Sequence, residues 1–198
     1  MLEDGSYWAL YGVNSSNTFF VSGFVQGFGT SNNGSYSGDS RDFGFSPAAT
    51  GTVSAQYTLN PSIVGTITTG NRVVNFNGGA IANSAYVYSR AAAVSEIVGT
   101  WSLQLSNGET LPITISNAGS VVGVSSRGCR ITATATPRPS GKNIFNVALT
   151  FGAAPCLLAG QPANGIAIVY PIAAGGTQLG VAVIDASRSN GLVGFARR

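Results

Sequence analysis

The sequence predicts an all-β protein, an antiparallel meander that forms an N-terminal β unit and a C-terminal small barrel. Three observations carry this prediction. Apolar and polar residues alternate in nearly every segment, and turn residues separate the segments at intervals of roughly 8–12 residues, giving about a dozen short strands. Charged residues make up only 9% of the 198 residues, against roughly 25% in ordinary domains. Glycine, Ser, Thr and Asn replace the missing charge, as in many secreted β proteins.

The N-terminal half contains a run of alternating segments with clear breakers. Asn60-Pro61 and Gly70-Asn71 are typical turn pairs. Neither face of residues 18–28 is fully polar, so we expect this strand to be covered on both sides. The predicted strands are residues 6–13, 18–28, 34–37, 42–45, 52–59, 62–68 and 72–77.

One helix is expected, over residues 89–98, because this segment is Ala-rich, opens on a Ser cap and ends at Gly99. It divides the chain into an N-terminal antiparallel unit, 1–88, and a C-terminal barrel, 89–198, although one continuous domain is the alternative. The later predicted strands are residues 100–105, 109–116, 120–126, 129–136, 143–151, 165–170, 178–186 and 191–196.

The two cysteines, Cys129 and Cys156, bracket a predicted hairpin. Antiparallel strands bring such positions close, so we expect a disulfide, with two buried free thiols as the alternative. The chain has no histidine, and two thiolates cannot complete a zinc shell, so we expect no metal and no cofactor.

A disulfide is typical of an oxidising compartment. We therefore expect an exported protein of the periplasm, the outer-membrane surface or the extracellular space. Its first residues, Met1-Leu2-Glu3-Asp4, have no signal-peptide character, so the expectation includes a signal peptide already removed. A lipid anchor that tethers the protein to the membrane is one form of this prediction.

Charge is unevenly placed along the chain. Residues 1–98 hold three arginines against five acidic residues, whereas residues 99–198 hold seven basic residues against two acidic ones. This asymmetry favours an acidic partner for the second half, with Arg127, Arg130 and Arg138 as candidate contacts. Scattered, solvated arginines are the alternative. No dense basic cluster is present, so we expect no nucleic-acid partner.

The catalytic inventory is poor, and we expect no enzyme. Without histidine there is no Ser-His or Cys-His pair. The single lysine, Lys142, falls in an exposed hairpin tip. Asp39 and Asp42 can form a carboxylate pair for glycoside hydrolysis, but we favour a turn held by their side chains.

Aromatic residues give the best candidate binding surface. Eight of them lie in the first 36 residues, including Trp8, Tyr11 and Phe24. Core packing accounts for most, yet strand alternation turns some outward. An exposed aromatic strip would mark a surface for a protein or glycan partner.

The triplet Gly99-Thr100-Trp101, preceded by a short helix and followed by a meander, resembles the opening of calycins, the lipocalin-like barrels. The resemblance implies that Trp101 closes one end of the barrel and that a late arginine packs across it. We assign Arg197, with Arg198 and Arg188 as alternatives. An N-terminal β unit followed by a small barrel is also similar to Gram-negative surface lipoproteins of the transferrin-binding protein B type.

These observations predict a non-catalytic surface or periplasmic binding protein, lipoprotein-like, that uses loops and edge strands for contact. Three alternatives remain. A structural subunit of a surface fibre would self-associate through open strand edges. An inhibitor or immunity protein would place the Arg-rich half on an enzyme. A carrier of a small apolar ligand would need a hollow barrel.

Overall fold

The computed structural model describes residues 1–15, 18–58, 62–79, 84–172 and 175–198. The chain divides into two compact units. The first contains residues 1–84 together with 188–190, and the second contains residues 85–187 and 191–198. The all-β prediction is confirmed, with fourteen strands among the described residues.

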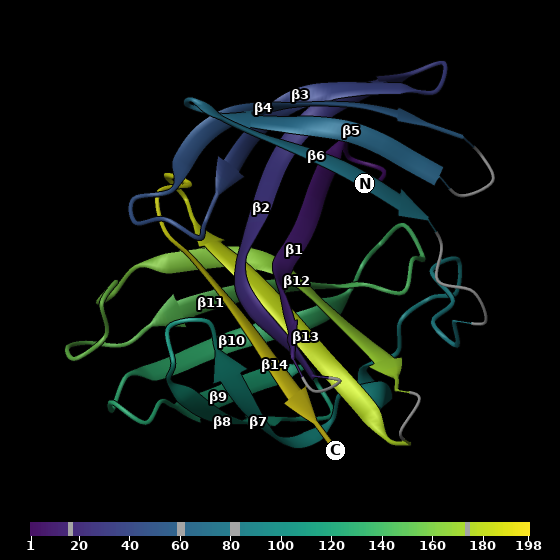
Figure 1. The fold of residues 1–198 in the computed structure, drawn as a ribbon. Coiled ribbons are helices and arrows are strands. Elements are labelled where there is room, and N and C mark those ends of the chain that lie inside the picture. Colours follow the sequence, from purple (N-terminus) through teal and green to yellow (C-terminus); the bar gives the residue numbers. More distant parts are fainter. Residues whose placement is uncertain (16–17, 59–61, 80–83, 173–174) are drawn as a thin grey trace. The chain divides into compact units, whose positions relative to one another are not determined.

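The first unit is a curled six-stranded sheet in which each strand pairs antiparallel with the next along the chain (Figure 1). The strands at its two edges are the first and the sixth. Among the described residues, neither edge strand pairs with a further strand. The strands are β1 (Ser6–Ser15), β2 (Thr18–Asn32), β3 (Ser35–Asp42), β4 (Ala49–Tyr57), β5 (Ser62–Thr69) and β6 (Arg72–Gly79).

The prediction of two short pieces at 34–37 and 42–45 is wrong, because one strand, β3, runs through to Asp42. The tight turn that precedes β3 explains why this strand begins at Ser35. Asn33 and Gly34 both have positive φ, 47° and 83°, as a two-residue hairpin turn with the right twist requires. The polar residues between the two predicted pieces form strand rather than turn because they pair with β2 and β4 on either side.

The second unit is a closed antiparallel barrel of eight strands. Pairing of β14 with β7, through Gly194–Leu105 and Phe195–Gln104, closes it. The strands are β7 (Gly99–Leu105), β8 (Thr110–Ile115), β9 (Ser120–Val124), β10 (Arg130–Pro137), β11 (Phe145–Phe151), β12 (Pro162–Pro171), β13 (Thr177–Asp185) and β14 (Gly191–Arg197).

The helix predicted over 89–98 is absent, and only a three-residue 3-10 turn, η1 (Val94–Glu96), forms there. A ten-residue helix is marginal without packing, and here the backbone finds partners elsewhere. The Ala92 amide donates to the Lys142 carbonyl (3.3 Å), and the amide of Asn143 donates to the carbonyl of the residue just before the segment. Hydrogen bonds to the loop at residues 142–143 therefore take the place of hydrogen bonds within a helix.

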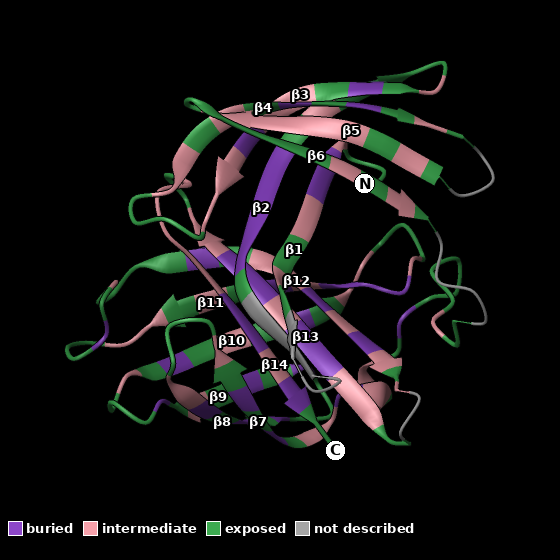
Figure 2. Cartoon of the chain, viewed as in Figure 1, coloured by how far each residue is buried: buried purple, intermediate pink, exposed green. Residues whose placement is uncertain are grey.

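Each unit has its own hydrophobic core, and buried and exposed residues alternate along the strands (Figure 2). The barrel core is large and mostly aliphatic, with Trp101 and Phe145 as its largest fully buried side chains. The core of the first unit is small. It contains Tyr7, Val25, Tyr36, Val53 and Ala55.

Candidate binding groove

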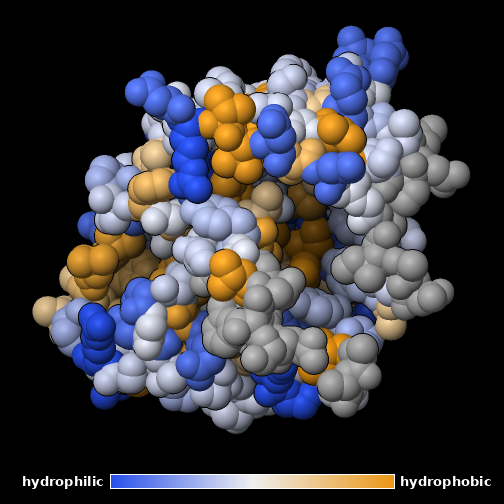
Figure 3. Space-filling view, in the orientation of Figure 1, coloured by the Kyte–Doolittle hydropathy of each residue, from blue (hydrophilic) through white to orange (hydrophobic). Residues whose placement is uncertain are grey.

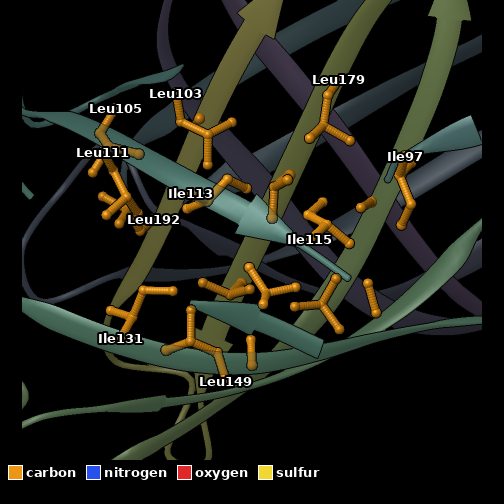
Figure 4. Close-up of a pocket in the computed structure, with 18 residues that line it drawn as sticks. Ile97, Leu103, Leu105, Leu111, Ile113, Ile115, Ile131, Leu149, Leu179 and Leu192 are labelled. Carbon is orange, nitrogen blue, oxygen red and sulfur yellow. The ribbon is translucent and has the colours of Figure 1, made fainter. Parts of the chain in front are cut away.

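The barrel interior is filled by its own side chains. Its cavity measures only about 60 Å³ and is lined almost wholly by Ile, Leu, Val and Ala. Leu103, Ile113 and Leu149 are among the side chains that converge on it (Figure 4). Pockets for small molecules measure roughly 300–1,000 Å³, so this cavity is too small to hold such a ligand.

Trp101, in the first strand of the barrel, is buried and held by several contacts. Its indole is 2% exposed and donates to the Ile97 carbonyl at 2.7 Å. The arginine over this ring is Arg198, whose guanidinium carbon lies 4.0 Å from the ring centroid. Arg198 also donates to the carbonyls of Val98 (2.6 Å) and Glu96 (3.0 Å).

The assignment of Arg197 to Trp101 is therefore corrected to Arg198. The Arg197 side chain donates to Gln178 at 3.0 Å instead. Arg198 follows the last residue of β14 and continues the strand pairing through backbone hydrogen bonds with Thr177, so its side chain points to the face opposite that of Arg197.

The predicted disulfide is confirmed. Cys129 and Cys156 are bonded, with Cα atoms 4.5 Å apart. The bond closes a segment that contains the β10–β11 hairpin, as the sequence indicated. A structural disulfide of this kind indicates an oxidising, extracytoplasmic location.

The first unit carries a larger hollow on the concave face of its sheet, here called the apolar groove. Its volume is about 430 Å³, within the range of small-molecule sites. Hydrophobic side chains gather around a hollow beside β1 and β6 in the space-filling view (Figure 3). The groove is lined by Met1, Tyr7, Trp8, Ala9, Leu10, Tyr11, Val25, Tyr36, Asp42, Val53, Ala55, Ile63, Ile67, Thr69, Arg72, Val74 and Phe76.

Glycines on the same face make room for the aromatic side chains of the groove. Tyr7 pairs across strands with Gly27, and Phe76 pairs with Gly65. A Cβ at Gly27 would lie 2.5 Å from the Tyr7 ring, and one at Gly65 would lie 2.6 Å from the Phe76 ring. Each ring therefore occupies space that a side chain on the partner strand would fill, as when an aromatic covers a strand glycine.

Two further tyrosines, Tyr11 and Tyr36, also lie against strand glycines. A Cβ at Gly23 would lie 2.5 Å from the Tyr11 hydroxyl, and one at Gly29 would lie 2.8 Å from the Tyr36 ring. Tyr36 is held in place because its hydroxyl donates to a backbone carbonyl at 2.8 Å. It also contacts Tyr7 edge-to-face, with ring centroids 5.8 Å apart. The aromatic wall is therefore fixed by sheet register and by hydrogen bonds.

The groove has one polar corner. The Tyr11 hydroxyl donates to Asp42 Oδ1 at 2.5 Å, and the Gly44 amide donates to the same oxygen at 2.9 Å. Burial, followed by the Asp42 carboxylate, raises the pKa of Tyr11 well above its usual value, so this hydroxyl remains a neutral donor. Arg72 supplies the only cationic side chain among the lining residues.

The candidate aromatic strip divides in two. Trp8 and Tyr11 are among the residues that line the groove. The prediction that Phe24 belongs to this surface is wrong, because Phe24 is 1% exposed. Its ring stacks between those of Trp8 and Phe43, with centroids 5.9 and 4.6 Å away. Phe24 is therefore covered and presents no surface.

Asp39 and Asp42 form no carboxylate pair and have no turn between them, although Asp42 accepts from the Gly44 amide in the turn that follows β3. Both lie in β3, three positions apart, so their side chains point to opposite faces of the sheet. Asp42 is at the corner of the groove, whereas Asp39 accepts from the Phe28 amide at 2.6 Å and from Arg188. Two carboxylates on opposite faces of one sheet do not flank a common bond, as glycoside hydrolysis requires.

Arg188 belongs to the first unit and is held there by several contacts. It donates to the Gln26 side chain at 3.0 Å and to Asp39, and it lies over the Phe28 ring at 5.1 Å. Burial disfavours the Asp39 anion, but hydrogen bonds from Arg188 and the Phe28 amide outweigh this, and the pKa of Asp39 is lowered.

The three candidate arginines of the second half do not form one patch. Arg127 lies in the turn before β10, Arg130 begins β10, and Arg138 follows its last residue. Seven steps of about 3.3 Å separate the first and last residues of β10, a distance of roughly 23 Å. Arg138 is also engaged, because it donates to Asn146 at 3.0 Å.

The described residues contain no group of three or more Cys, Asp or Glu side chains placed to hold a metal ion. Nor does any helix in the described ranges have the length and hydrophobicity to cross a membrane. Comparisons with family profiles, with curated proteins and with solved structures give no match to this chain.

Proposed function

We propose that this protein is a non-catalytic, exported binding protein that holds a small, mainly apolar ligand in the apolar groove of its first unit. The observation that carries the proposal is the groove itself, about 430 Å³ in volume, with an aromatic wall and one polar corner. Small-molecule sites have this character, an apolar lining with a few placed polar groups.

The barrel supports this assignment by contrast. A ligand carrier of the calycin type uses the barrel interior, and here that interior is packed to a remnant of about 60 Å³. An apolar cavity of this size has room for a few groups the size of a water molecule at most. The barrel is then the scaffold, and the first unit is the ligand-binding part.

Dye binding tests the proposal on the whole chain. The uncharged aromatic dye N-phenyl-1-naphthylamine fluoresces when it enters an apolar site. The test variant is Val74→Trp, which fills the groove, and the control is Val73→Trp. Val74 lines the groove and is 45% exposed, whereas Val73 is its neighbour on β6, 59% exposed and outside the lining.

We expect one dye per chain and at least a tenfold loss of affinity in V74W, with V73W close to the parent. Equal binding by both variants, or no binding by the parent protein, contradicts the proposal. Near-ultraviolet circular dichroism of each variant verifies that the fold is intact.

Attachment to a Gram-negative cell surface is the second part of the proposal. It is supported by the order of the units, a β sheet followed by a small barrel, which is similar to that of transferrin-binding protein B-like lipoproteins. The Trp101–Arg198 contact supports a calycin-like barrel. Expression of the full gene with radiolabelled palmitate and cell fractionation test it, and an unlabelled protein in the culture medium excludes a lipid anchor.

Self-association is a competing function that the sheet edges favour. β6 is an edge strand with two exposed valines, Val73 and Val74, and open edges of this kind pair with other strands. A structural subunit would form concentration-dependent oligomers in size-exclusion chromatography. A sharp monomer at high concentration rules this function out and leaves the groove as the binding site.

A further inference from the structure

We infer that the ligand of the apolar groove is an aromatic acid, a flat apolar molecule with one anionic group that pairs with Arg72. This inference rests on the proposed function and adds the chemical class of the ligand to it. Two features of the groove carry it, the unpaired cation on its rim and the aromatic composition of its wall.

Arg72 is on the ligand side of the sheet. It is the first residue of β6, and strand alternation places it on the same face as Val74 and Phe76, which also line the groove. Its side chain is exposed and has no ion pair or hydrogen bond among the described residues. A guanidinium with free donors is the group that best recognises a carboxylate, sulfonate or phosphate.

The acidic residue of the groove already has partners. Asp42 Oδ1 accepts from the Tyr11 hydroxyl and from the Gly44 amide, and two such donors stabilise a carboxylate without any cation. Because the Tyr11 hydroxyl stays protonated, it adds no charge of its own. Arg72 therefore remains available as the cationic contact for a ligand.

The wall favours rings over alkyl chains. Tyr11 and Phe76 line the groove with partly exposed rings, and the buried Tyr7 and Tyr36 complete its lining. Each of the four rings lies directly against a strand glycine. Preplaced aromatic side chains bind aromatic ligands by stacked or edge-to-face contacts. Because the rings are held by register before any ligand arrives, little ordering is required on binding.

The test compares two dyes that share an anilinonaphthalene skeleton. The first, 1-anilinonaphthalene-8-sulfonate, carries one anionic group, and N-phenyl-1-naphthylamine carries none. The quantity measured is the ratio of their dissociation constants for the full chain. The variant is Arg72→Gln, and the matched control is Arg127→Gln, an exposed arginine of the second unit that lies outside the groove.

We expect the parent protein to prefer the sulfonate dye. R72Q should reduce that preference about fivefold, the effect of one exposed ion pair, and R127Q should leave it unchanged. Raising the salt concentration should reduce it in the parent but not in R72Q.

The two levels of the proposal fail differently. If both dyes bind in the groove and R72Q leaves their ratio unchanged, the inference about an acid is overturned while the proposed function stands. If neither dye binds, or if V74W leaves both affinities unchanged, the groove is not a ligand site and both are overturned.

Discussion

At the scale of single residues, Arg188 and Arg198 each make several contacts that stabilise the fold. Arg188 has a left-handed backbone conformation (φ 55°), which is uncommon for a residue with a side chain, and its guanidinium bonds to Gln26 and Asp39. Arg198 lies over Trp101 and donates to two carbonyls. These contacts make predictions for stability that differ from those for the neighbouring arginines.

Asp39 gives the first prediction, a dependence of stability on pH. Its folded-state pKa lies below the ordinary value of 3.8, so its interactions stabilise the folded state above pH 3.8 and are lost as the pH falls through the lower value. Urea unfolding of D39N and the parent should differ by about 1 kcal/mol or less at neutral pH, because the Asp39 side chain is 41% exposed. The difference should vanish in strong acid; one that grows on acidification contradicts this account.

Arg198 gives the second prediction. Removing its contact with Trp101 and its two hydrogen bonds in R198A should lower the free energy of unfolding by about 1–2 kcal/mol. R197A, which removes only an exposed hydrogen bond to Gln178, should change it by about 0.5 kcal/mol or less. Chemical denaturation followed by Trp fluorescence measures the free energy of unfolding of both variants. Equal losses in R198A and R197A would show that the contact between Arg198 and Trp101 does not stabilise the fold.

At the scale of the elements, paired glycines and aromatics explain a glycine-rich strand composition. Gly65 sits opposite Phe76, and its missing side chain leaves room for that ring. Gly78 lies on the neighbouring strand, and a Cβ added there would make only an ordinary contact, 3.4 Å from the Ile63 side chain. The same residue type therefore has different roles on the two strands of one hairpin.

The third prediction compares these two glycines. G65A should destabilise the protein by about 1–3 kcal/mol, because the new methyl group meets the Phe76 ring and the Ser54 carbonyl. G78A should be nearly neutral. The measurement is urea denaturation of each variant, and a G65A protein as stable as G78A would refute the close packing of Phe76.

Local pattern was sufficient for most strands but not for the groove. Alternation predicts nearly all strand positions, and the Cys129–Cys156 pair follows from hairpin geometry. The groove depends on which glycine stands opposite which ring, and that register is a property of pairing between strands. A helix over 89–98 is the wrong prediction from local pattern because the partner of this segment, the loop at Lys142, is distant in sequence.

At the scale of the whole molecule, the two units differ in how completely their sheets close. The barrel closes through β14 and β7 and fills its interior with side chains. The six-stranded sheet leaves β1 and β6 unpaired with each other among the described residues, and its glycine-rich concave face holds a space of about 430 Å³. An open sheet retains the room that a small closed barrel loses.

We propose that the open sheet, not the barrel, receives an apolar ligand. The most direct measurement is a methyl NMR titration of the full chain with N-phenyl-1-naphthylamine. Ile63, Ile67 and Val74 line the groove, and Ile131 and Leu149 line the barrel cavity. We predict saturable shifts at the first three methyl-bearing residues and none at the last two. Shifts confined to Ile131 and Leu149 would contradict the account.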